Sequence, residues 1–282
     1  MRNLEKERLD ILLNERGFFE TREKAKRAIM AGIVYSNEQR LDKPGVKVPK
    51  DIDISIKGKQ MPYVSRGGYK LEKALKVFDL TVKGKIIIDI GASTGGFTDC
   101  ALQNGAKYCY AVDVGYNQLA WKLRQDERVI VMERTNFRYL KPEDLSREMP
   151  EFACIDVSFI SLKRILPPLK KILVPDSDIV ALIKPQFEAG KELVGKKGIV
   201  RDRKVHEMVI EDILQFSLNE GFDCLNIDYS PITGGDGNIE FLLHLKWPGY
   251  NEGVKGKNQF QTPIAELVID AHNQLKHGKR EE

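Results

Sequence analysis

The sequence predicts a doubly wound α/β domain with a seven-stranded, mainly parallel sheet, preceded by a small α+β domain over residues 1–58. Three observations support this. The 282 residues are 42% hydrophobic and 30% charged, an ordinary globular composition that can fill one large core and one smaller core. After residue 85, apolar segments of strand length alternate with helical patterns. The whole net charge of +4 lies before residue 61, where 14 basic residues oppose 10 acidic ones.

The first 58 residues are expected to form two helices and a small sheet. Leucines at helical spacing predict a first helix that stops at Gly17. A second helix is expected to begin after Thr21, a favourable N-cap, and to end at Gly32. Short segments with β-type composition follow at residues 33–35 and 51–56. This amount of structure fits a domain of about 60 residues.

A linker over residues 59–64 is expected to lead into the larger domain, residues 65–250. Its expected strands are Ile86–Ile90, Tyr108–Val114, Val129–Met132, Phe152–Val157, Ile179–Ile183, Asp223–Tyr229 and Ile239–Leu245. Helical patterns between most of these strands indicate a mainly parallel sheet with helices on both faces. Residues 251–282 form a polar tail, in which an amphipathic stretch over residues 263–275 is expected to pack back on the domain.

Composition also excludes several classes of protein. The chain is neither disordered nor collagen-like, and no run approaches the roughly 18 apolar residues that a membrane span needs. The N-terminal residues include no apolar stretch, so a soluble, cytoplasmic protein without membrane contact is expected. Cysteines without a C-x-x-C pair argue against a disulfide framework or a metal site, so we expect them to be reduced and mostly buried. These cysteines are Cys100, Cys109, Cys154 and Cys224.

A glycine-rich turn over residues 91–98 directly follows the first expected strand of the large domain. Such a turn lets a ligand approach the backbone closely, at the crevice where doubly wound sheets bind their ligands. The spacing is G-x-x-x-G-G, which is neither the G-x-G-x-x-G fingerprint nor a Walker motif. NAD and ATP are therefore not the first choices. Without a ligand, the same turn would be a tight connection between a strand and a helix.

Two carboxylates accompany this turn. Asp89 precedes it and can receive an ammonium group, whereas a pyrophosphate would be repelled. Asp113 lies 24 residues later, at the end of the second strand, where a carboxylate can accept hydrogen bonds from ribose hydroxyls. An amino acid fused to a nucleoside satisfies both, which makes S-adenosylmethionine the expected cofactor. The candidate cofactor residues are Asp89, Gly91, Ala92, Ser93, Gly95, Gly96, Phe97, Asp113, Val114 and Asn136, the last at the expected adenine edge.

Four further polar residues lie where strands or helices begin or end. Lys70 stands at the head of a helix, Asp156 and Lys184 close the fourth and fifth strands, and Glu240 lies at the start of the last strand. Because the carboxyl ends of adjacent parallel strands converge on one crevice, the first three could meet beside the cofactor. Taken singly, a lysine at such a place is usually solvated and an aspartate usually caps a helix or loop.

The segments SRGGYKL, DIGASTGGFTD, IDVSFISL, LIKPQFE and GNIEF occur in this order. They resemble the motifs of FtsJ-type ribose 2′-O-methyltransferases, and more closely those of the TlyA family, which joins an S4 RNA-binding domain to that catalytic domain. Residues 5–56 resemble the S4 domain, so the resemblance spans almost the whole chain. It implies a class I, Rossmann-like methyltransferase fold and a catalytic tetrad of Lys70, Asp156, Lys184 and Glu240. The family has also carried a haemolysin label.

The resemblance implies methyl transfer from S-adenosylmethionine to a ribose 2′-hydroxyl in ribosomal RNA, with cytidine as the expected nucleotide. A 2′-hydroxyl is a poor nucleophile until a proton leaves, and only the neutral form of a lysine can take that proton. A second lysine and the sulfonium of the cofactor place positive charge near Lys184, which favours its neutral amine. Lys184 is therefore the expected base, while Lys70 and Glu240 hold the substrate and Asp156 positions Lys184.

Ribosomal RNA or a ribosomal subunit is the expected partner, and the sequence leaves the oligomeric state open. The candidate RNA-binding residues are Arg8, Arg22, Lys24, Lys26, Arg27 and Arg66. A charge cluster of this kind is otherwise an ordinary solvated helix face. No rim of stacking aromatic residues is evident, so recognition is expected to depend on phosphate contacts and RNA shape. The segment over residues 188–198, rich in Gly and Lys, is either a mobile loop facing RNA or a plain surface loop.

Three other functions fit the sequence less well. A membrane-active haemolysin would need an apolar or strongly amphipathic segment, which the sequence does not show. A non-catalytic RNA-binding assembly factor would retain the cofactor fold without turnover, and the intact tetrad argues against it. A small-molecule methyltransferase would leave the S4-like domain unexplained.

Overall fold

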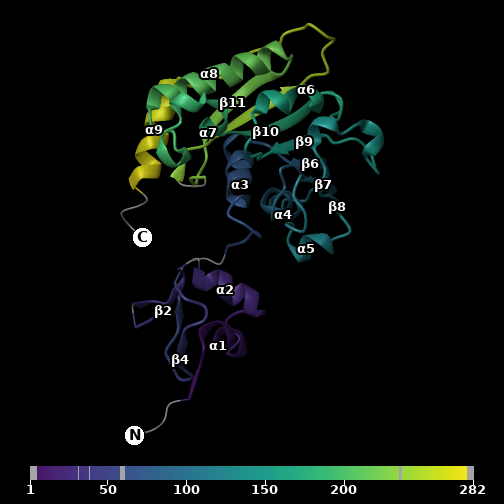
Figure 1. Cartoon of the computed structure of the whole chain (residues 1–282). Helices are drawn as coiled ribbons and strands as arrows, with labels where there is room; N and C mark the ends of the chain where they lie inside the picture. The colour runs from purple at the N-terminus through teal and green to yellow at the C-terminus, as the bar shows by residue number, and fades with distance from the viewer. Residues whose placement is uncertain (1–4, 31, 38, 58–60, 235–236, 278–282) are drawn as a thin grey trace. The chain divides into compact units, whose positions relative to one another are not determined.

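The chain forms two compact units, residues 1–62 and residues 63–282, in the computed structural model (Figure 1). The boundary between the units falls within the expected linker, residues 59–64. The units have separate hydrophobic cores. The residues that the structure describes are 5–30, 32–37, 39–57, 61–234 and 237–277.

The first unit contains two helices and two small antiparallel sheets. Its elements are β1 (Lys6–Arg8), α1 (Leu9–Glu15), α2 (Arg22–Met30), β2 (Val34–Ser36), β3 (Gln39–Arg40), β4 (Lys47–Pro49) and β5 (Ser55–Ile56). β1 pairs with β4, and β2 lies between β3 and β5. The sequence predicts both helices and parts of β2 and β5. It does not predict β1, β3 and β4, because strands of two or three residues are too short to show alternation.

Helix α2 begins and ends at the residues that the sequence predicts. Thr21 Oγ1 accepts a hydrogen bond from the amide of Lys24 at 3.2 Å, which is the geometry of an N-cap. Gly17 and Gly32 follow the two helices with φ of +74° and +73°. This left-handed backbone favours glycine, so each glycine provides a stop for its helix.

A buried carboxylate, Asp10, ties the two helices of the first unit together. Its side chain is 0% exposed, Oδ1 accepts from Arg8 Nε at 3.0 Å, and Oδ2 accepts from Arg22 Nε at 2.7 Å. Burial alone would raise the pKa of Asp10, but the hydrogen bonds and charges of the two guanidinium groups lower it to about 2. The carboxylate therefore stays ionised inside the unit.

The second unit is built on one seven-stranded sheet. Its strands are β6 (Ile86–Ile90), β7 (Tyr108–Val112), β8 (Val129–Met132), β9 (Phe152–Ile155), β10 (Ser177–Ile183), β11 (Asp223–Tyr229) and β12 (Phe241–Trp247). Their order is β11-β12-β10-β9-β6-β7-β8. β12 is antiparallel to β10 and β11, and the remaining pairs are parallel. This mixed, mainly parallel sheet confirms the predicted fold class.

The strand ends differ from the prediction where they approach the crevice. β7 and β9 each end two residues early, so that Asp113 and Asp156 lie just beyond the sheet. β12 begins two residues late, so that Glu240 precedes it. At these positions the backbone leaves the ladder and forms loops, which the sequence pattern of a buried strand does not reveal.

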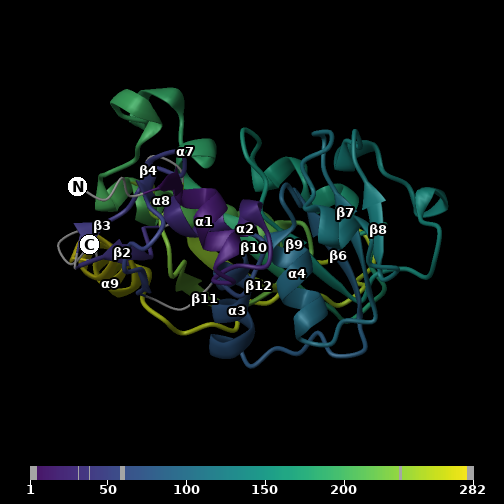
Figure 2. The same cartoon turned by 90° about the horizontal axis from the view of Figure 1, so that it is seen from below.

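Helices cover both faces of the sheet (Figures 1 and 2). One face carries α3 (Gly68–Val77), α4 (Gly96–Gln103) and α5 (Trp121–Arg124), and the other carries α6 (Leu166–Leu169), α8 (Arg203–Asn219) and α9 (Ile264–His277). The remaining short helices are α7 (Pro185–Glu188) and 3₁₀ turns at Phe137–Tyr139, Pro142–Asp144, Leu162–Arg164, Lys191–Leu193 and Lys196–Gly198. α9 buries Leu267, Val268 and Ala271 in the same core as α8. The amphipathic stretch near the C-terminus therefore packs on the large domain.

All four cysteines are free and buried, which confirms the sequence prediction. Within the described ranges, no helix has the length and apolar character to cross a membrane. In the same residues, no group of three or more His, Cys, Asp or Glu side chains is arranged to hold a metal ion.

Replacing Asp10 by Asn is expected to lower the free energy of unfolding of the first unit by about 2 kcal/mol at neutral pH, because two arginines lose their buried counter-charge. The folded pKa of Asp10 lies below its unfolded value of 3.8. The stabilisation is therefore complete above about pH 4 and is lost as the pH falls towards about 2. Urea unfolding of the full chain, followed by NMR signals of α1 and α2 amides, measures both effects. Equal stabilities of wild type and variant would contradict this assignment.

Candidate active site

A pocket of about 550 Å³ opens beyond the carboxyl ends of β6 and β9. β6 is the first strand of the sheet in sequence, and it has β7 on one side and β9 on the other. The strand order reverses at this point, and open α/β sheets bind their ligands at such a switch point. The walls come from the head of α3, the turn after β6, the loops after β9 and β10, and the segment before β12.

The glycine-rich turn forms one wall of the pocket. Gly91 has φ of +87°, and a Cβ there would lie 2.6 Å from the backbone oxygen of Asp156. Only glycine permits this close approach of the turn to the loop after β9. Of the predicted turn residues, the pocket is lined by Gly91, Ala92, Ser93, Gly96 and Phe97. Gly95 lies outside the walls, and its Cα faces the side chain of Leu123.

Asp89 lines the pocket although its side chain is almost fully buried, at 1% exposure. Its Oδ2 accepts from the amide and hydroxyl of Thr98 at 2.9 and 2.7 Å. Its Oδ1 has no hydrogen-bond partner within the part of the chain that the structure describes. Burial raises the pKa of Asp89 to about 7, and the charge of Asp156 adds to the rise. A cationic donor in the pocket would satisfy the orphaned oxygen, which fits the expected ammonium group.

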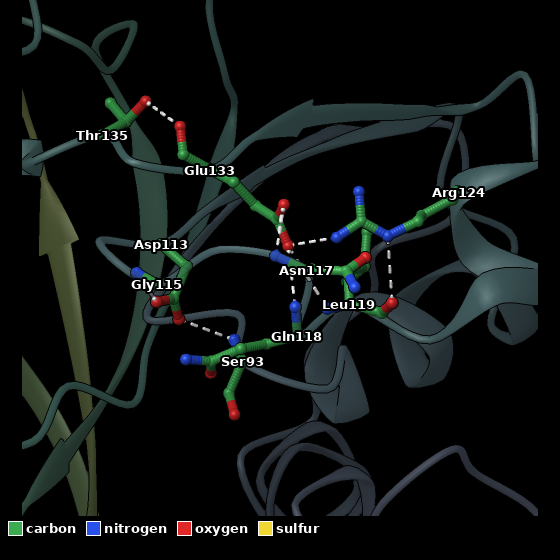
Figure 3. Close-up of polar contacts among 9 residues, drawn as sticks. All are labelled: Ser93, Asp113, Gly115, Asn117, Gln118, Leu119, Arg124, Glu133 and Thr135. Carbon is green, nitrogen blue, oxygen red and sulfur yellow. Dashed lines mark hydrogen bonds and ion pairs between the residues drawn. The ribbon is translucent and has the colours of Figure 1, made fainter.

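Asp113 fixes the turn from outside the pocket (Figure 3). Its Oδ2 accepts from the amide of Ser93 at 2.7 Å, and its Oδ1 accepts from the amide of Gly115 at 2.7 Å. Ser93 has φ of +48° and lies on the pocket wall, so Asp113 holds a strained wall residue in place. Each carboxylate oxygen has a second lone pair that can accept from a hydroxyl. Binding of a ribose by Asp113 stays a prediction.

Glu133 is a second acidic residue in this region, and the sequence analysis did not single it out (Figure 3). Its carboxylate accepts from the amides of Asn117, Gln118 and Leu119 at 2.9, 3.0 and 3.4 Å, and it pairs with Arg124. The hydrogen bond from Arg124 and the three amides lower the pKa of Glu133 to about 2, against the effect of burial. Glu133 thus organises the loop after β7. The sequence signal that could have indicated this role is that Glu133 directly follows the strand β8.

Two other predicted cofactor residues lie outside the pocket walls. Val114 is 71% exposed, which leaves an apolar surface beside Asp113. Asn136 Oδ1 accepts from the amide and Nε of Arg138, both at 3.2 Å. The structure therefore places Asp89 and most of the turn in the pocket, while the residues expected to contact the nucleoside lie beyond its walls.

The four predicted catalytic residues meet in the pocket. Lys70 Nζ lies 2.6 Å from Glu240 Oε2 and 3.2 Å from Asp156 Oδ2. Lys184 Nζ lies 2.5 Å from Asp156 Oδ1. The side chains thus form one chain of alternating acids and lysines, Glu240–Lys70–Asp156–Lys184, in which Asp156 contacts both lysines. Each of the four side chains is at most 18% exposed.

Local structure brings each member to the same place. Lys70 lies in the first turn of α3, Asp156 directly follows β9, and Lys184 is the residue between β10 and α7. Glu240 precedes the antiparallel strand β12 and packs against Gly234, where a Cβ would lie 2.0 Å from Glu240 Oε1. Gly234 is therefore required for the buried position of that carboxylate.

The two lysines differ in the number of carboxylates that they contact. Burial alone would lower the pKa of Lys70, but Asp156 and Glu240 raise it above its usual value. Burial alone would raise the pKa of Asp156, but Lys70 and Lys184 lower it. Lys70 is therefore an ammonium ion between two carboxylates. Lys184 contacts one carboxylate and donates to the hydroxyl of Ser158 at 3.2 Å.

One exposed aromatic side chain lies at the pocket, although the sequence shows no rim of stacking aromatic residues. Phe159 lines the pocket, is 91% exposed, and has φ of +63°. Its ring centroid lies 5.0 Å from that of Phe187. A large aromatic side chain in this conformation is uncommon, and such strain is typical of functional sites. The signal in the sequence was an aromatic residue three positions after the strand-end acid Asp156.

The predicted RNA-binding residues of the first unit are exposed or half-buried, and most contact acids of the same unit. Arg8 and Arg22 pair with Asp10, Lys24 pairs with Glu20, and Lys26 pairs with Glu23 at 2.7 Å. Arg27 is exposed on the same helix, and Arg66 lines the pocket of the second unit. The pairs of Lys24 and Lys26 with surface glutamates are weak, so phosphates can compete for these two lysines. Their contact with RNA stays a prediction.

The segment over residues 188–198 is anchored beside the pocket. It contains two 3₁₀ turns, Lys191–Leu193 and Lys196–Gly198, and Gly198 lines the pocket. The side chain of Asn238 donates to the carbonyl of Gly198 at 2.9 Å and accepts from the amide of Val200 at 3.1 Å. The end of this segment therefore faces the site.

Comparison with known proteins agrees with this geometry. Residues 63–247 match the FtsJ-like methyltransferase profile, and residues 7–51 match the S4 domain. The chain is 68% identical to "Putative rRNA methyltransferase YqxC" of Bacillus subtilis, over 97% of each chain. It is 40% identical to "16S/23S rRNA (cytidine-2'-O)-methyltransferase TlyA" of Mycobacterium tuberculosis, over 85% of this chain and 89% of that protein. The chain belongs to the TlyA family.

A solved structure of similar sequence shares the arrangement of this TlyA-family chain. The protein titled "Putative hemolysin from Streptococcus thermophilus" is 54% identical, with a TM-score of 0.77. The similarity covers 99% of this chain and 100% of that one. The family membership and the seven-stranded class I methyltransferase sheet thus agree with the resemblance that the sequence motifs indicate.

Replacing Lys70 by Met is expected to lower the free energy of unfolding by about 3 kcal/mol, because Asp156 and Glu240 are left close together without the cation between them. Adding Glu240→Gln to this variant should restore part of the loss, since the orphaned charge is removed. Lys76→Met, at an exposed position of the same helix, is the control and should cost less than about 0.5 kcal/mol. Urea denaturation measures all three. A Lys70→Met protein as stable as the control would disprove this account.

Proposed function

We propose that this TlyA-family protein transfers a methyl group from S-adenosylmethionine to the ribose 2′-hydroxyl of a cytidine in ribosomal RNA. One observation carries the proposal: the chain Glu240–Lys70–Asp156–Lys184 lines the same pocket as the turn after β6. The match to FtsJ-like methyltransferases and the name of the mycobacterial relative support it. The S4 match supports structured RNA as the partner of residues 1–58.

The pocket fits the proposed cofactor. The class I fold implies use of S-adenosylmethionine, which supplies a methyl group bonded to a positively charged sulfur. Asp89 Oδ1 would accept from the ammonium group, and the backbone at Gly91 leaves room for close approach. Asp113 would accept from the ribose hydroxyls, Val114 would cover the adenine, and Asn136 would contact its edge. These assignments assume that the nucleoside half extends beyond the pocket walls.

The tetrad is proposed to prepare the hydroxyl for attack. Lys184, in its neutral form, would take the proton from the 2′-hydroxyl, and the oxygen would bond to the methyl carbon that the cofactor supplies as its bond to sulfur breaks. Lys184 is proposed as the base in preference to Lys70, because Lys184 contacts one carboxylate whereas Lys70 lies between two. Lys70 and Glu240 hold the ribose, and Asp156 orients both amines. Most of the acceleration would come from in-line alignment of oxygen, carbon and sulfur.

The substrate nucleotide is proposed to leave the RNA stack before it reacts. A 2′-hydroxyl reaches the buried amine of Lys184 only when the nucleotide enters the pocket. The exposed ring of Phe159 offers a surface on which its base can stack, and Arg66 offers a contact for phosphate. Binding of RNA would thus combine phosphate contacts with one aromatic contact at the site.

Methylation of purified ribosomal subunits by the full-length protein tests the proposed function directly. Mass spectrometry of nuclease digests is expected to locate a new methyl group on the 2′-oxygen of a cytidine. A methyl group on a base, or none on either subunit, would rule out the proposal.

Lys184→Met is expected to lower the rate of methyl transfer by at least about 1,000-fold, because the proton acceptor is removed. The Kd for S-adenosylmethionine should change less than about threefold, since Lys184 is not among the proposed cofactor contacts. Rapid-quench kinetics and calorimetry measure the two quantities. Lys171→Met, an exposed lysine, is the control. Appreciable methyl transfer by Lys184→Met would refute its role as the base.

Binding of S-adenosylmethionine is expected to tighten as the pH rises. Only ionised Asp89 attracts an ammonium group, and its pKa in the free protein is about 7. The affinity should therefore rise roughly fivefold to tenfold between about pH 6 and about pH 7.5, and then level off as the ligand's own ammonium begins to titrate. Calorimetry across this range measures the effect. Asp89→Asn should bind more weakly and without this dependence; an equally steep profile would exclude Asp89 as its source.

A further inference from the structure

Glu188, the last residue of α7, connects two loops of the site. Its Oε2 accepts from the hydroxyl of Ser161 at 2.5 Å, and its Oε1 accepts from the amide of Leu162 at 2.8 Å. Burial raises the pKa of the carboxyl, and these two hydrogen bonds oppose the rise. The carboxylate is not among the residues that line the pocket, and its two hydrogen bonds join it to the loop after β9.

The two loops contain Lys184 and the side chains that contact it. The loop after β9 contains Asp156, Ser158 and Phe159, and the segment after β10 contains Lys184 and Phe187. Three contacts join them at the pocket: the ion pair of Lys184 with Asp156, its hydrogen bond to Ser158, and the packing of the two phenylalanine rings. Glu188 adds a fourth connection at the far end of both loops.

The conformation of the first loop needs such support. Phe159 has φ of +63° and is 91% exposed, so neither backbone preference nor burial holds it in place. Ser161, two residues later, is fixed twice: it donates to Glu188 and accepts from the amide of Lys163 at 3.1 Å. The carboxylate and this N-cap together fix the C-terminal end of the loop, while the backbone amide of Asp156 donates a hydrogen bond to the carbonyl of Ile90 at 3.0 Å and fixes its other end.

We propose that Glu188 is a positioning residue for methyl transfer. It holds the loop over residues 157–161 against the segment after β10, and thereby keeps Phe159 where the base of the substrate nucleotide stacks. The inference rests on the proposed function, because it assigns Phe159 to the substrate. Without the carboxylate, Ser161 and Leu162 lose their acceptor, and the loop relaxes from its strained conformation.

Glu188→Ala, Glu188→Gln and the control Glu192→Ala test this role. Glu192 is exposed in the same segment. Glu188→Ala is expected to lower kcat for ribosomal RNA by up to about 100-fold, because small misplacements of reacting groups are costly, and to leave the Kd for S-adenosylmethionine within about twofold. Glu188→Gln should stay within about threefold of wild type, since its amide can accept from Leu162 and donate to Ser161. Wild-type kcat in Glu188→Ala, or equal losses in the Ala and Gln variants, would overturn the proposal.

Hydrogen exchange without RNA gives a readout independent of activity. Amides of residues 157–162 should exchange at least about tenfold faster in Glu188→Ala, while those of β6 and β10 are unchanged. Unchanged exchange in the loop would overturn the proposal. So would faster exchange that spreads over the whole second unit, because this would indicate general destabilisation. If wild type places no methyl group on a 2′-oxygen, the proposed function fails, and the exchange data still show whether Glu188 holds the loop.

A double-mutant cycle tests whether Glu188 acts through Phe159. Phe159→Ala alone is expected to lower kcat/KM for ribosomal RNA about tenfold, through loss of base stacking. In that background, Glu188→Ala should cost less than about threefold more, since the side chain that it positions is gone. Fully additive losses would overturn the link between the two residues.

Discussion

The shared carboxylate of Asp156 is the interaction on which the site depends. The side-chain nitrogens of Lys70 and Lys184 lie within 3.2 Å of its two oxygens, and each lysine comes from a different part of the fold. The sheet order makes this possible, because β9 lies between β6 and β10. β12 runs in the opposite direction, so its amino end reaches the same edge, and Glu240 must precede the strand to complete the chain. The same strand order and directions that form the sheet therefore also bring the two acids and the two lysines together.

Sequence patterns were sufficient for the features that depend on strand ends. Alternation of strands and helices predicts the sheet, and the positions of Lys70, Asp156 and Lys184 at element ends predict that these three meet. The fourth member, Glu240, is expected from the resemblance to the family motifs. Contacts set by loop conformation could not be predicted in this way. Three features depend on backbone angles that composition does not encode. They are the amides that donate to Glu133, the exposed ring of Phe159, and the hydrogen bonds from Ser161 and Leu162 to Glu188. Strands as short as β3 and β4 lack the length to show a period.

The charge surplus of the first unit has a different meaning in the structure than in the sequence. The cations predicted to contact RNA are mostly paired with acids of the same unit, and Asp10 alone engages two arginines. The proposed attraction to RNA would therefore depend on the net field and on competition for the exposed pairs, rather than on a row of free cations. Because Asp10 is buried, it also limits the directions in which Arg8 and Arg22 can point, so that they are partly ordered before any RNA binds.

The buried cysteines have a practical consequence for work with this protein. Burial raises the pKa of Cys100 and Cys224 to about 12, and that of Cys109 and Cys154 also lies well above the usual value. Since the thiolate is the reactive form, the native chain resists alkylation and oxidation at neutral pH. A single cysteine placed on the surface would then be the preferred target of a thiol-reactive dye, without removal of the natural ones. The buried natural cysteines would therefore add little background signal to fluorescence measurements with such a dye.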